Sequence, residues 1–187
     1  QVAVAGQVVA RDTVARVRSQ VGLVFQDPDD QLFMPTVAQD VAFGPLNFGV
    51  PAAQVPDRVA EALAAVGMAD AADSYPGHLS FGQRRRVAIA TVLSCRPSVM
   101  VLDEPTSNLD PAARRELAEV VAALEVTVLM VTHDLPFALQ LCPRSVILDA
   151  GRVQADGDTR TLLTDAGLMA RHRLELPFGF DPQADTP

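Results

Sequence analysis

Two runs of apolar residues, at positions 98–102 and 126–131, constrain most strongly what this chain can fold into. Each run has the length of one strand, and strands that are apolar at nearly every position are typical of a parallel sheet with helices on both faces. The residues between them, 111–124, have a helical pattern, and helices that alternate with such strands indicate βαβ units. The sequence therefore predicts an α/β fold around a parallel sheet whose strands are buried on both faces.

A long helical region interrupts this pattern. A third apolar run, residues 21–25, ends at Gln26, and residues 36 to about 96 have a helical pattern with Thr36 and Ser80 as predicted N-caps. We therefore predict a single domain over residues 1–187 with three parts: an inserted helical subdomain (27–96), a sheet core (97–158), and C-terminal helices with a tail (159–187). Residues 145–153 are predicted to form a hairpin near the edge of the core.

The charge of the chain limits its partners. Its formal net charge is −8, which argues against a general nucleic-acid binder, because such proteins normally show a basic face. All 15 basic residues are arginine, so the sequence contains no lysine. The apolar runs are far shorter than the ~20 residues that cross a bilayer, and we expect neither secretion nor a membrane span.

Two carboxylates directly follow the apolar run at residues 98–102. Asp103 and Glu104 should lie at the C-terminal end of a buried strand, which is where α/β sheets bind ligands. An aspartate in that place can hold Mg²⁺, and the adjacent glutamate can act as a general base on a water molecule. The dipeptide alone is equally typical of a strand that ends in solvated acids. The neighbouring sequence elements therefore decide between a catalytic site and a solvated strand end.

Four further elements stand in order around this pair. They are Gln26 after the first apolar run; Ser80, Phe81, Gly82 and Gln83 at the start of a predicted helix; Ser107, Asn108, Leu109 and Asp110 after the two acids; and His133 after the last run. With these elements in this order, essentially the whole chain resembles the ATP-binding cassette (ABC) family. The elements resemble its Q-loop, signature motif, D-loop and H-loop, and residues 99–104 resemble its Walker B motif.

The resemblance implies a fold, an activity and cofactors. The fold is a P-loop NTPase-like parallel-sheet core with an inserted α-helical subdomain, and the activity is ATP hydrolysis with ATP and Mg²⁺. Glu104 would be the general base, and His133 would sense the γ-phosphate. Asp103 and Gln26 would hold Mg²⁺, and Gln26 would also touch the attacking water. The signature residues would bind the γ-phosphate of an ATP held by the opposite subunit, because a helix N-terminus favours an anion.

These residues also have ordinary structural interpretations. His133 alone could be a core histidine, Gln26 a polar residue at a strand end, and the signature residues a common helix cap. Phe81 departs from the usual motif, which has glycine there, and it forbids the backbone conformations reserved for glycine. The basic residues 84–86 on the same helix are predicted to form a solvated face and not a nucleic-acid site.

One element of the family is absent from the sequence. A phosphate-binding P-loop has the pattern Gly-x-x-x-x-Gly-Lys-Ser/Thr, in which the backbone and the lysine hold the phosphates. No such pattern occurs, and without lysine no variant of it can. In the family this loop precedes the segment present here, so we interpret the chain as an N-terminally truncated ABC cassette, either a fragment or a degenerate subunit, and we expect it to be inactive alone.

Residues 26–45 indicate which branch of the family the chain resembles. They resemble the insertion of energy-coupling-factor ATPases, with those of cobalt/nickel importers nearest. The resemblance implies a peripheral subunit at the cytoplasmic face of the cell membrane that drives uptake of cobalt, nickel or another micronutrient. Its partners would be a second ABC ATPase subunit, identical or different, in a head-to-tail pair, and an integral-membrane coupling subunit. Two alternatives stay open: a non-transport ABC ATPase, and a non-hydrolysing cassette that only completes a partner's ATP site.

Overall fold

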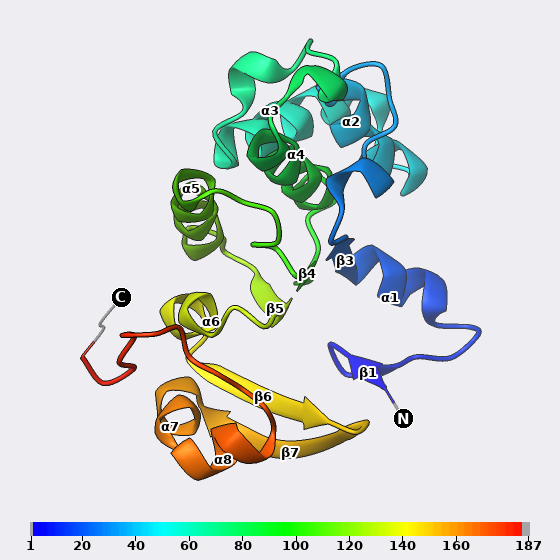
Figure 1. Ribbon diagram of the computed structural model, residues 1–187. Helices are drawn as coiled ribbons and strands as arrows, with labels where there is room; N and C mark the ends of the chain where they lie inside the picture. Colours follow the sequence, from blue (N-terminus) through cyan, green and yellow to red (C-terminus); the bar gives the residue numbers. More distant parts are fainter. Residues whose placement is uncertain (1, 185–187) are drawn as a thin grey trace. The chain divides into compact units, whose positions relative to one another are not determined.

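The computed structural model describes residues 2–184, and the chain forms two compact units (Figure 1). The first unit ends at Val131 and the second begins at Thr132, so the boundary falls inside the predicted core of residues 97–158. Over the described residues, no helix combines the length and the apolar character that crossing a membrane requires.

A parallel three-stranded sheet is the scaffold of the first unit. Its strands are β3 (Val21–Val24), β4 (Val99–Asp103) and β5 (Thr127–Val131), in the order β3-β4-β5. In the register of the sheet, Leu23 lies beside Val101 and Val101 lies beside Leu129. Helix α5 (Pro111–Ala122) connects β4 with β5, which confirms the predicted α/β arrangement.

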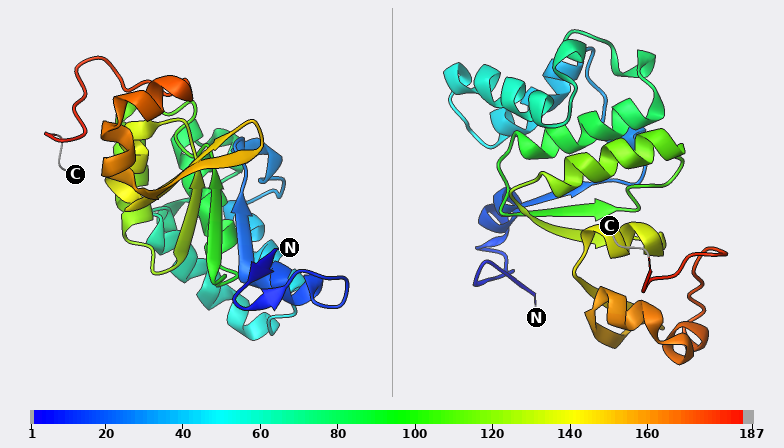
Figure 2. Two further views of the ribbon diagram at one scale, coloured as in Figure 1. Left: turned by 90° about the horizontal axis from the view of Figure 1, so that it is seen from below. Right: turned by 90° about the vertical axis from the view of Figure 1, so that its left-hand side faces the viewer.

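Helices cover one face of this sheet. Helices α4 (Phe81–Leu93) and α5 lie along it (Figure 2), and Val24, Met100 and Leu102 are fully buried on this face. Gly22 of β3 belongs to the same face, and a Cβ there would stand only 2.0 Å from a methyl group of Val92 on α4. The close packing of helix against strand therefore requires glycine at this position.

The opposite face is exposed, so the prediction that the strands are buried on both faces was wrong. The exposed fractions are 44 % for Leu23, 44 % for Phe25 just beyond β3, 56 % for Leu129 and 52 % for Val131. Exposed and buried residues alternate because successive side chains of a strand point to opposite faces. The prediction assumed a second helical layer, which the described residues of the first unit do not provide over these four side chains. We call these four residues the open face.

A helical subdomain separates β3 from β4 in the sequence. It comprises the short 3-10 helix η1 (Pro28–Asp30), α2 (Val37–Asn47), η2 (Ala52–Gln54), α3 (Val55–Ala65), η3 (Ala69–Ala71), η4 (Pro76–His78) and α4. Both predicted N-caps are confirmed, since the hydroxyl groups of Thr36 and Ser80 accept N–H groups in the first turns of α2 and α4. The buried core of the subdomain includes Val37, Val41, Leu63, Val66, Val87 and Ile89.

A short hairpin and a helix precede β3. Strands β1 (Ala3–Val4) and β2 (Gln7–Val8) pair antiparallel, and α1 (Val14–Gln20) leads into β3. Helix α1 was not predicted from the sequence. The sequence signal for this helix is weak. Of its seven residues only Val17 is buried, so no apolar face repeats along the helix, and the side chain of Thr13 makes no capping hydrogen bond.

The second unit is an antiparallel hairpin with short helices. Helix α6 (Leu135–Leu141) precedes strands β6 (Arg144–Asp149) and β7 (Arg152–Asp158), which form the predicted hairpin. The chain reverses at Ala150 and Gly151, whose φ angles are 50° and 72°, as in a type I′ turn. Helices α7 (Thr159–Thr164) and α8 (Ala166–Arg171) follow. The core of this unit is formed by Leu135, Leu139, Leu163 and Met169.

Candidate functional site

Three predicted site residues of the first unit lie at one edge of the parallel sheet. Gln26 follows β3, Asp103 is the last residue of β4, and Glu104 comes next, so they lie at the carboxyl ends of adjacent strands. The Glu104 backbone N–H donates to the carbonyl of Val131, the last residue of β5, at 2.8 Å. Asp103 and Glu104 are half-buried, whereas Gln26 is exposed. The sheet thus brings an amide and two carboxylates from separate parts of the sequence to one edge.

The backbone of Glu104 is strained. Its φ angle is 42°, in the left-handed region that residues other than glycine occupy at a cost of roughly 1–2 kcal/mol. Two hydrogen bonds hold it there: its N–H donates to Val131, and its carbonyl accepts the N–H of Ser107 at 3.2 Å. Strained residues persist where the surrounding structure enforces them, and they cluster at functional sites. Glu104 therefore takes a fixed direction that a continued strand would not give it.

The oxygen atoms at this edge suit a magnesium ion. Mg²⁺ prefers oxygen ligands, and it is usually bound by one or two carboxylates together with waters and substrate phosphates. Asp103 offers a carboxylate and Gln26 an amide oxygen at neighbouring strand ends. This small donor set fits an ion that shares its coordination with a nucleotide.

Residues 107–110, the predicted D-loop, form a tight connection between β4 and α5. Asn108 has a φ angle of 62°, which asparagine tolerates better than most residues. The Asp110 carboxylate caps α5 by accepting the N–H groups of Ala112 and Ala113, both at 2.9 Å. The connection is therefore bonded to Glu104 at one end, through the Ser107 N–H, and to α5 at the other, through the Asp110 carboxylate.

The predicted signature residues form the start of α4. Ser80 and Gln83 make a reciprocal capping box, in which the Gln83 side chain accepts the Ser80 N–H at 2.9 Å. The N–H groups of Phe81 and Gly82 belong to the first turn, where amides have no acceptor within the helix and can bind an anion. Neither residue has a positive φ angle. Phe81 therefore occupies an ordinary helical position, and the conformations it forbids are not used.

Gly82 is required for space rather than for its backbone freedom. A Cβ at this position would stand 2.8 Å from the Cβ of Ala113 on α5, closer than carbon atoms pack. Ala113 is also one of the residues capped by Asp110. Through Gly82, α4 therefore approaches the helix that continues directly from residues 107–110.

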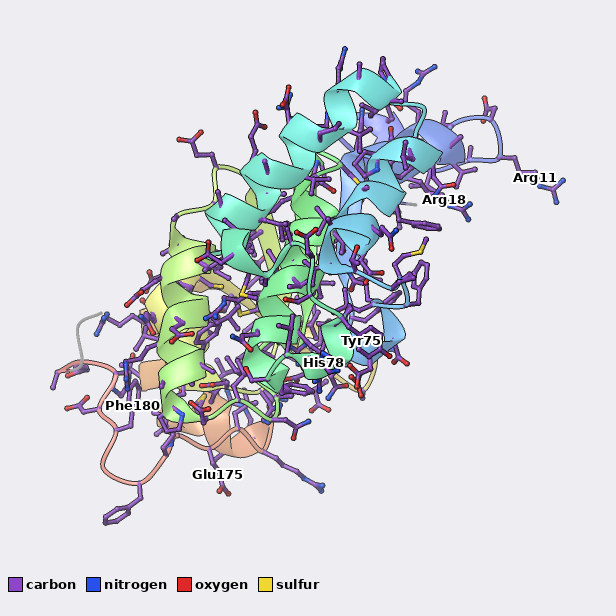
Figure 3. All side chains as sticks on the ribbon, turned by 90° about the horizontal axis from the view of Figure 1, so that it is seen from above. Arg11, Arg18, Tyr75, His78, Glu175 and Phe180 are labelled. Carbon is purple, nitrogen blue, oxygen red and sulfur yellow. The ribbon has the colours of Figure 1, made fainter. Side chains whose placement is uncertain are left out.

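An aromatic pair borders the signature residues. Tyr75 and His78 flank the short turn before Ser80, and their rings meet edge to face with centroids 5.4 Å apart (Figure 3). Gly77 lies between them, and a Cβ there would be 2.5 Å from the Tyr75 ring. The chain thus turns tightly just before the Ser80 cap.

The arginines of α4 are not the solvated face that the sequence predicted. Arg85 is fully buried, and its two terminal nitrogens donate to the carbonyls of Phe25 at 2.9 Å and Ser107 at 3.4 Å. Arg84 pairs with Asp29 at 2.9 Å, and Arg86 pairs with Glu116. All three cations therefore have partners within the first unit.

The spacing of residues along α4 explains why the prediction of a solvated face was wrong. The same spacing contains a signal for the burial of Arg85 that was missed. Arg85 precedes Ala88, Ile89 and Val92 by three, four and seven residues, and all three of these residues are buried. That spacing marks one face of a helix, so Arg85 belongs to the inner face. Burial lowers the pKa of the Arg85 guanidinium, and the negative charge of Asp27 opposes this effect.

The predicted H-loop residue, His133, lies in the second unit. It is exposed and follows Thr132, just beyond the end of β5. The Thr132 hydroxyl accepts the N–H of Asp134 at 2.9 Å, and the Asp134 carboxylate caps α6 by accepting the N–H of Phe137 at 3.1 Å. These hydrogen bonds fix the backbone on both sides of His133.

Comparison with known proteins shows similarity over most of the chain. The sequence profile of the ABC transporter family matches residues 1–107. A Streptomyces coelicolor protein named as an ABC transporter ATP-binding protein is 62 % identical over 183 residues, which are 98 % of this chain and 70 % of that protein. The energy-coupling factor transporter ATP-binding protein EcfA of Carboxydothermus hydrogenoformans is 44 % identical over 180 residues, which are 95 % of this chain and 66 % of EcfA.

A solved structure is also similar. It is cbiO1 from Clostridium perfringens, described as part of the ABC transporter complex cbiONQ, with a TM-score of 0.77 and 36 % sequence identity. The similarity covers 90 % of this chain and 68 % of cbiO1. These relatives are longer than this chain, which matches 66–70 % of each.

Proposed function

Because the chain belongs to the ABC transporter family of ATP-binding subunits, we propose that it is the ATPase subunit of an energy-coupling-factor importer for cobalt, nickel or another micronutrient. The observation that carries this proposal is the position of Gln26, Asp103 and Glu104 at or just beyond the carboxyl ends of the adjacent strands β3 and β4. The resemblance of residues 26–45 to the insertion of such ATPases supports the importer type, as does the similarity to EcfA and cbiO1.

In this proposal the residues at the sheet edge divide the work of hydrolysis. When bound, ATP would supply the phosphoryl group and Mg²⁺ would neutralise the charge that develops on it. Asp103 and Gln26 would hold the ion, and Glu104 would accept a proton from the attacking water at a carboxylate oxygen. The strained turn positions Glu104 before substrate binds. By its resemblance to the H-loop residue, His133 is proposed to sense the γ-phosphate.

The signature residues act on a second ATP molecule. Ser80 and Gln83, with the backbone N–H groups of Phe81 and Gly82, bind the γ-phosphate of an ATP held by a partner subunit. The positive end of the α4 dipole favours an anion there, since the helix has 13 residues. The partner is therefore a second ABC ATPase subunit in head-to-tail arrangement.

A further segment completes the phosphate site in this proposal. The sequence contains no lysine, and a P-loop lysine reaches the β- and γ-phosphates. The open face presents Leu23, Phe25, Leu129 and Val131, an apolar surface of the kind that a second layer buries in parallel sheets. The completing segment covers this face and carries the phosphate loop, in keeping with the greater length of the relatives.

The helical subdomain carries the surface proposed for the membrane subunit. Phe33 and Phe43 are 61 % and 42 % exposed, and their rings meet edge to face with centroids 4.9 Å apart. The buried Asp40 carboxylate accepts the N–H groups of Phe33 and Met34, both at 3.0 Å, and so holds the loop that presents Phe33. Burial raises the pKa of Asp40, and these two hydrogen bonds oppose the rise. A coupling helix that packs on this aromatic pair would place the protein at the cytoplasmic face of the membrane.

The proposal is tested on a cassette completed with the N-terminal segment of the Streptomyces coelicolor relative. We expect it to hydrolyse ATP, and Glu104→Gln should lower kcat on the order of 10²-fold or more, because an amide cannot accept the proton. Binding of Mg-ATP should survive, and the ATP-bound dimer should accumulate. Asp103→Asn should instead weaken Mg²⁺-dependent nucleotide binding.

Glu125→Gln is the matched control, since Glu125 is an exposed carboxylate before β5, at the opposite edge of the sheet. It should hydrolyse ATP like the wild type. Normal turnover in Glu104→Gln would refute the assignment of the base. A completed wild type that binds ATP without hydrolysing it would instead support the non-hydrolysing alternative.

A further inference from the structure

One buried cation of α4 holds two loops of the proposed ATP site. Arg85 donates to the carbonyl of Phe25, which immediately precedes Gln26, and to the carbonyl of Ser107, the first residue of the predicted D-loop. The two bonds are 2.9 and 3.4 Å long, so the bond to Phe25 is the stronger one. We propose that Arg85 is a positioning residue that couples both loops to the signature end of α4, an inference that rests on the proposed function.

Because Arg85 is buried, its charged group interacts with the two backbone carbonyls and not with solvent. The residue has an exposed fraction of 0 %, and burying a charge is unfavourable unless hydrogen bonds compensate it. Within residues 2–184 its Nε has no hydrogen-bond partner, and the bonds to Phe25 and Ser107 are made from the two ends of the guanidinium fork. Both acceptors are backbone carbonyls of the loops. The fork therefore fixes main-chain positions.

A second side chain ties the same strand end to α4. The Gln31 side-chain oxygen accepts the N–H of Phe25 at 3.1 Å, and its nitrogen donates to the Ala88 carbonyl at 2.9 Å and the Thr91 hydroxyl at 2.7 Å. Both backbone polar groups of Phe25 are thus bonded to α4, one through Arg85 and one through Gln31. A displacement of α4 must move Phe25 and, with it, Gln26.

The ring of Phe81 also contacts Arg85, which is a physical reason for phenylalanine at a position where the usual motif has glycine. Its ring centroid lies 5.3 Å from the guanidinium carbon of Arg85 and 5.7 Å from that of Arg84, which is within the range of cation–π attraction. A glycine would leave this side of the Arg85 guanidinium without the ring. The first residue of α4 therefore supports the cation that holds the loops.

The coupling joins two different ATP molecules. The start of α4 binds the partner's ATP in the proposed dimer, whereas Gln26 and residues 107–110 serve the ATP bound by this chain. Because Arg85 lies one turn into α4, a shift of the helix start on nucleotide contact moves both loops together. Arg85 thereby links the occupancy of one ATP site to the geometry of the other.

Hydrogen exchange in the completed, nucleotide-free cassette tests this without requiring activity. Arg85→Met removes both donors and keeps an apolar stem, and Arg85→Lys keeps the charge but lacks the rigid fork that reaches two carbonyls. In both variants we expect amides in residues 25–31 and 107–109 to exchange about tenfold faster, as local opening becomes easier. Exchange in α3 should stay unchanged. Arg96→Met, which removes an exposed arginine paired with Glu61 beyond the end of α4, should match the wild type.

Kinetics supply a second readout. We expect kcat to fall roughly 10- to 100-fold through misplacement of the reacting groups, while KM for Mg-ATP changes less than about threefold. Exchange that is unchanged in either loop would overturn the positioning role. So would a uniform rise across α3 and α4 with a lower urea midpoint, which would mark a purely structural role. If Arg85→Met does not fold, Arg85→Lys decides. A completed wild type without ATPase activity would refute the proposed function and leave the exchange test intact.

Discussion

The contact between Gly82 and Ala113 leads to a quantitative prediction for Gly82→Ala. The added Cβ would stand 2.8 Å from the Ala113 Cβ, where ordinary contact begins at 3.4 Å, so α4 and α5 must separate by about 0.6 Å. Neither methyl group can rotate away, because each is fixed to its helix backbone. The strain therefore has to move the helices themselves.

The expected free-energy change combines two opposing terms. Overpacking of this kind costs about 1–3 kcal/mol, and replacing glycine by alanine within a helix recovers up to about 1 kcal/mol. We expect Gly82→Ala to lower the free energy of unfolding by about 1 kcal/mol. In a Gly82→Ala/Ala113→Gly double variant the clash disappears, so the two changes should couple favourably by about 1–3 kcal/mol.

Urea unfolding of the completed cassette measures these values, and Gly167→Ala is the matched control. Gly167 is likewise the second residue of its helix, α8, but its Cβ would meet only a terminal nitrogen of Arg171 and the Asp165 carboxylate oxygen that caps α8, both at 3.3 Å, so a shift of about a tenth of an ångström relieves the contact. That variant should be neutral or slightly stabilised. ATPase activity should fall in Gly82→Ala, because α5 carries residues 107–110 with it, and should recover in the double variant.

A clear result would contradict this reasoning. If Gly82→Ala is as stable as Gly167→Ala and the double-variant coupling is below about 0.5 kcal/mol, the helices are not held apart by this contact. Activity lost in Gly82→Ala but not recovered by Ala113→Gly would show that Gly82 acts through its own backbone and not through α5.

Three further predictions concern the nucleotide, the membrane partner and pH. Calorimetric titration of the 187-residue chain should detect no micromolar Mg-ATP site, since no lysine is present to reach the phosphates; saturable binding with turnover would contradict this. In the completed cassette, Phe33→Arg should keep basal ATPase activity near normal and abolish both pull-down of the membrane subunit and uptake, because it places a charge on the exposed aromatic pair; retained uptake would refute the docking surface. A hydrogen bond from His172 lowers the pKa of Asp149, so this pair should stabilise the second unit above the ordinary aspartate pKa and lose that effect as pH falls through the lowered pKa. Urea midpoints of wild type and His172→Ala should therefore converge at low pH, and a constant difference would count against the pair.

The features that could be predicted from the sequence depend on local patterns. The apolar runs before Gln26 and Asp103 indicated strands, and the structure has strands there. Thr36 and Ser80 indicated helix starts, because a cap bonds to residues within the next turn. The assignment to the ABC family, confirmed by the family profile and the relatives, came from motifs of this local kind.

The features that were missed depend on partners far along the chain. Arg85 has helical spacing that marks the inner face, but its acceptor Phe25 lies 60 residues away, and no local pattern identifies it. The left-handed backbone of Glu104 is held by a bond to Val131 on another strand. The space restriction at Gly82 comes from α5. The open face depends on whether a second layer is present, which a continuous apolar run within a strand does not reveal.

The open face also has a consequence for engineering. The open face is a binding surface for a separately made polypeptide, because burying its four apolar side chains would favour association. If the completing segment is supplied as a second molecule, hydrolysis depends on the meeting of the two pieces. The rate of phosphate release then reports how often they meet, and an ABC motor divided at this surface becomes a sensor of proximity between whatever proteins the two pieces are fused to.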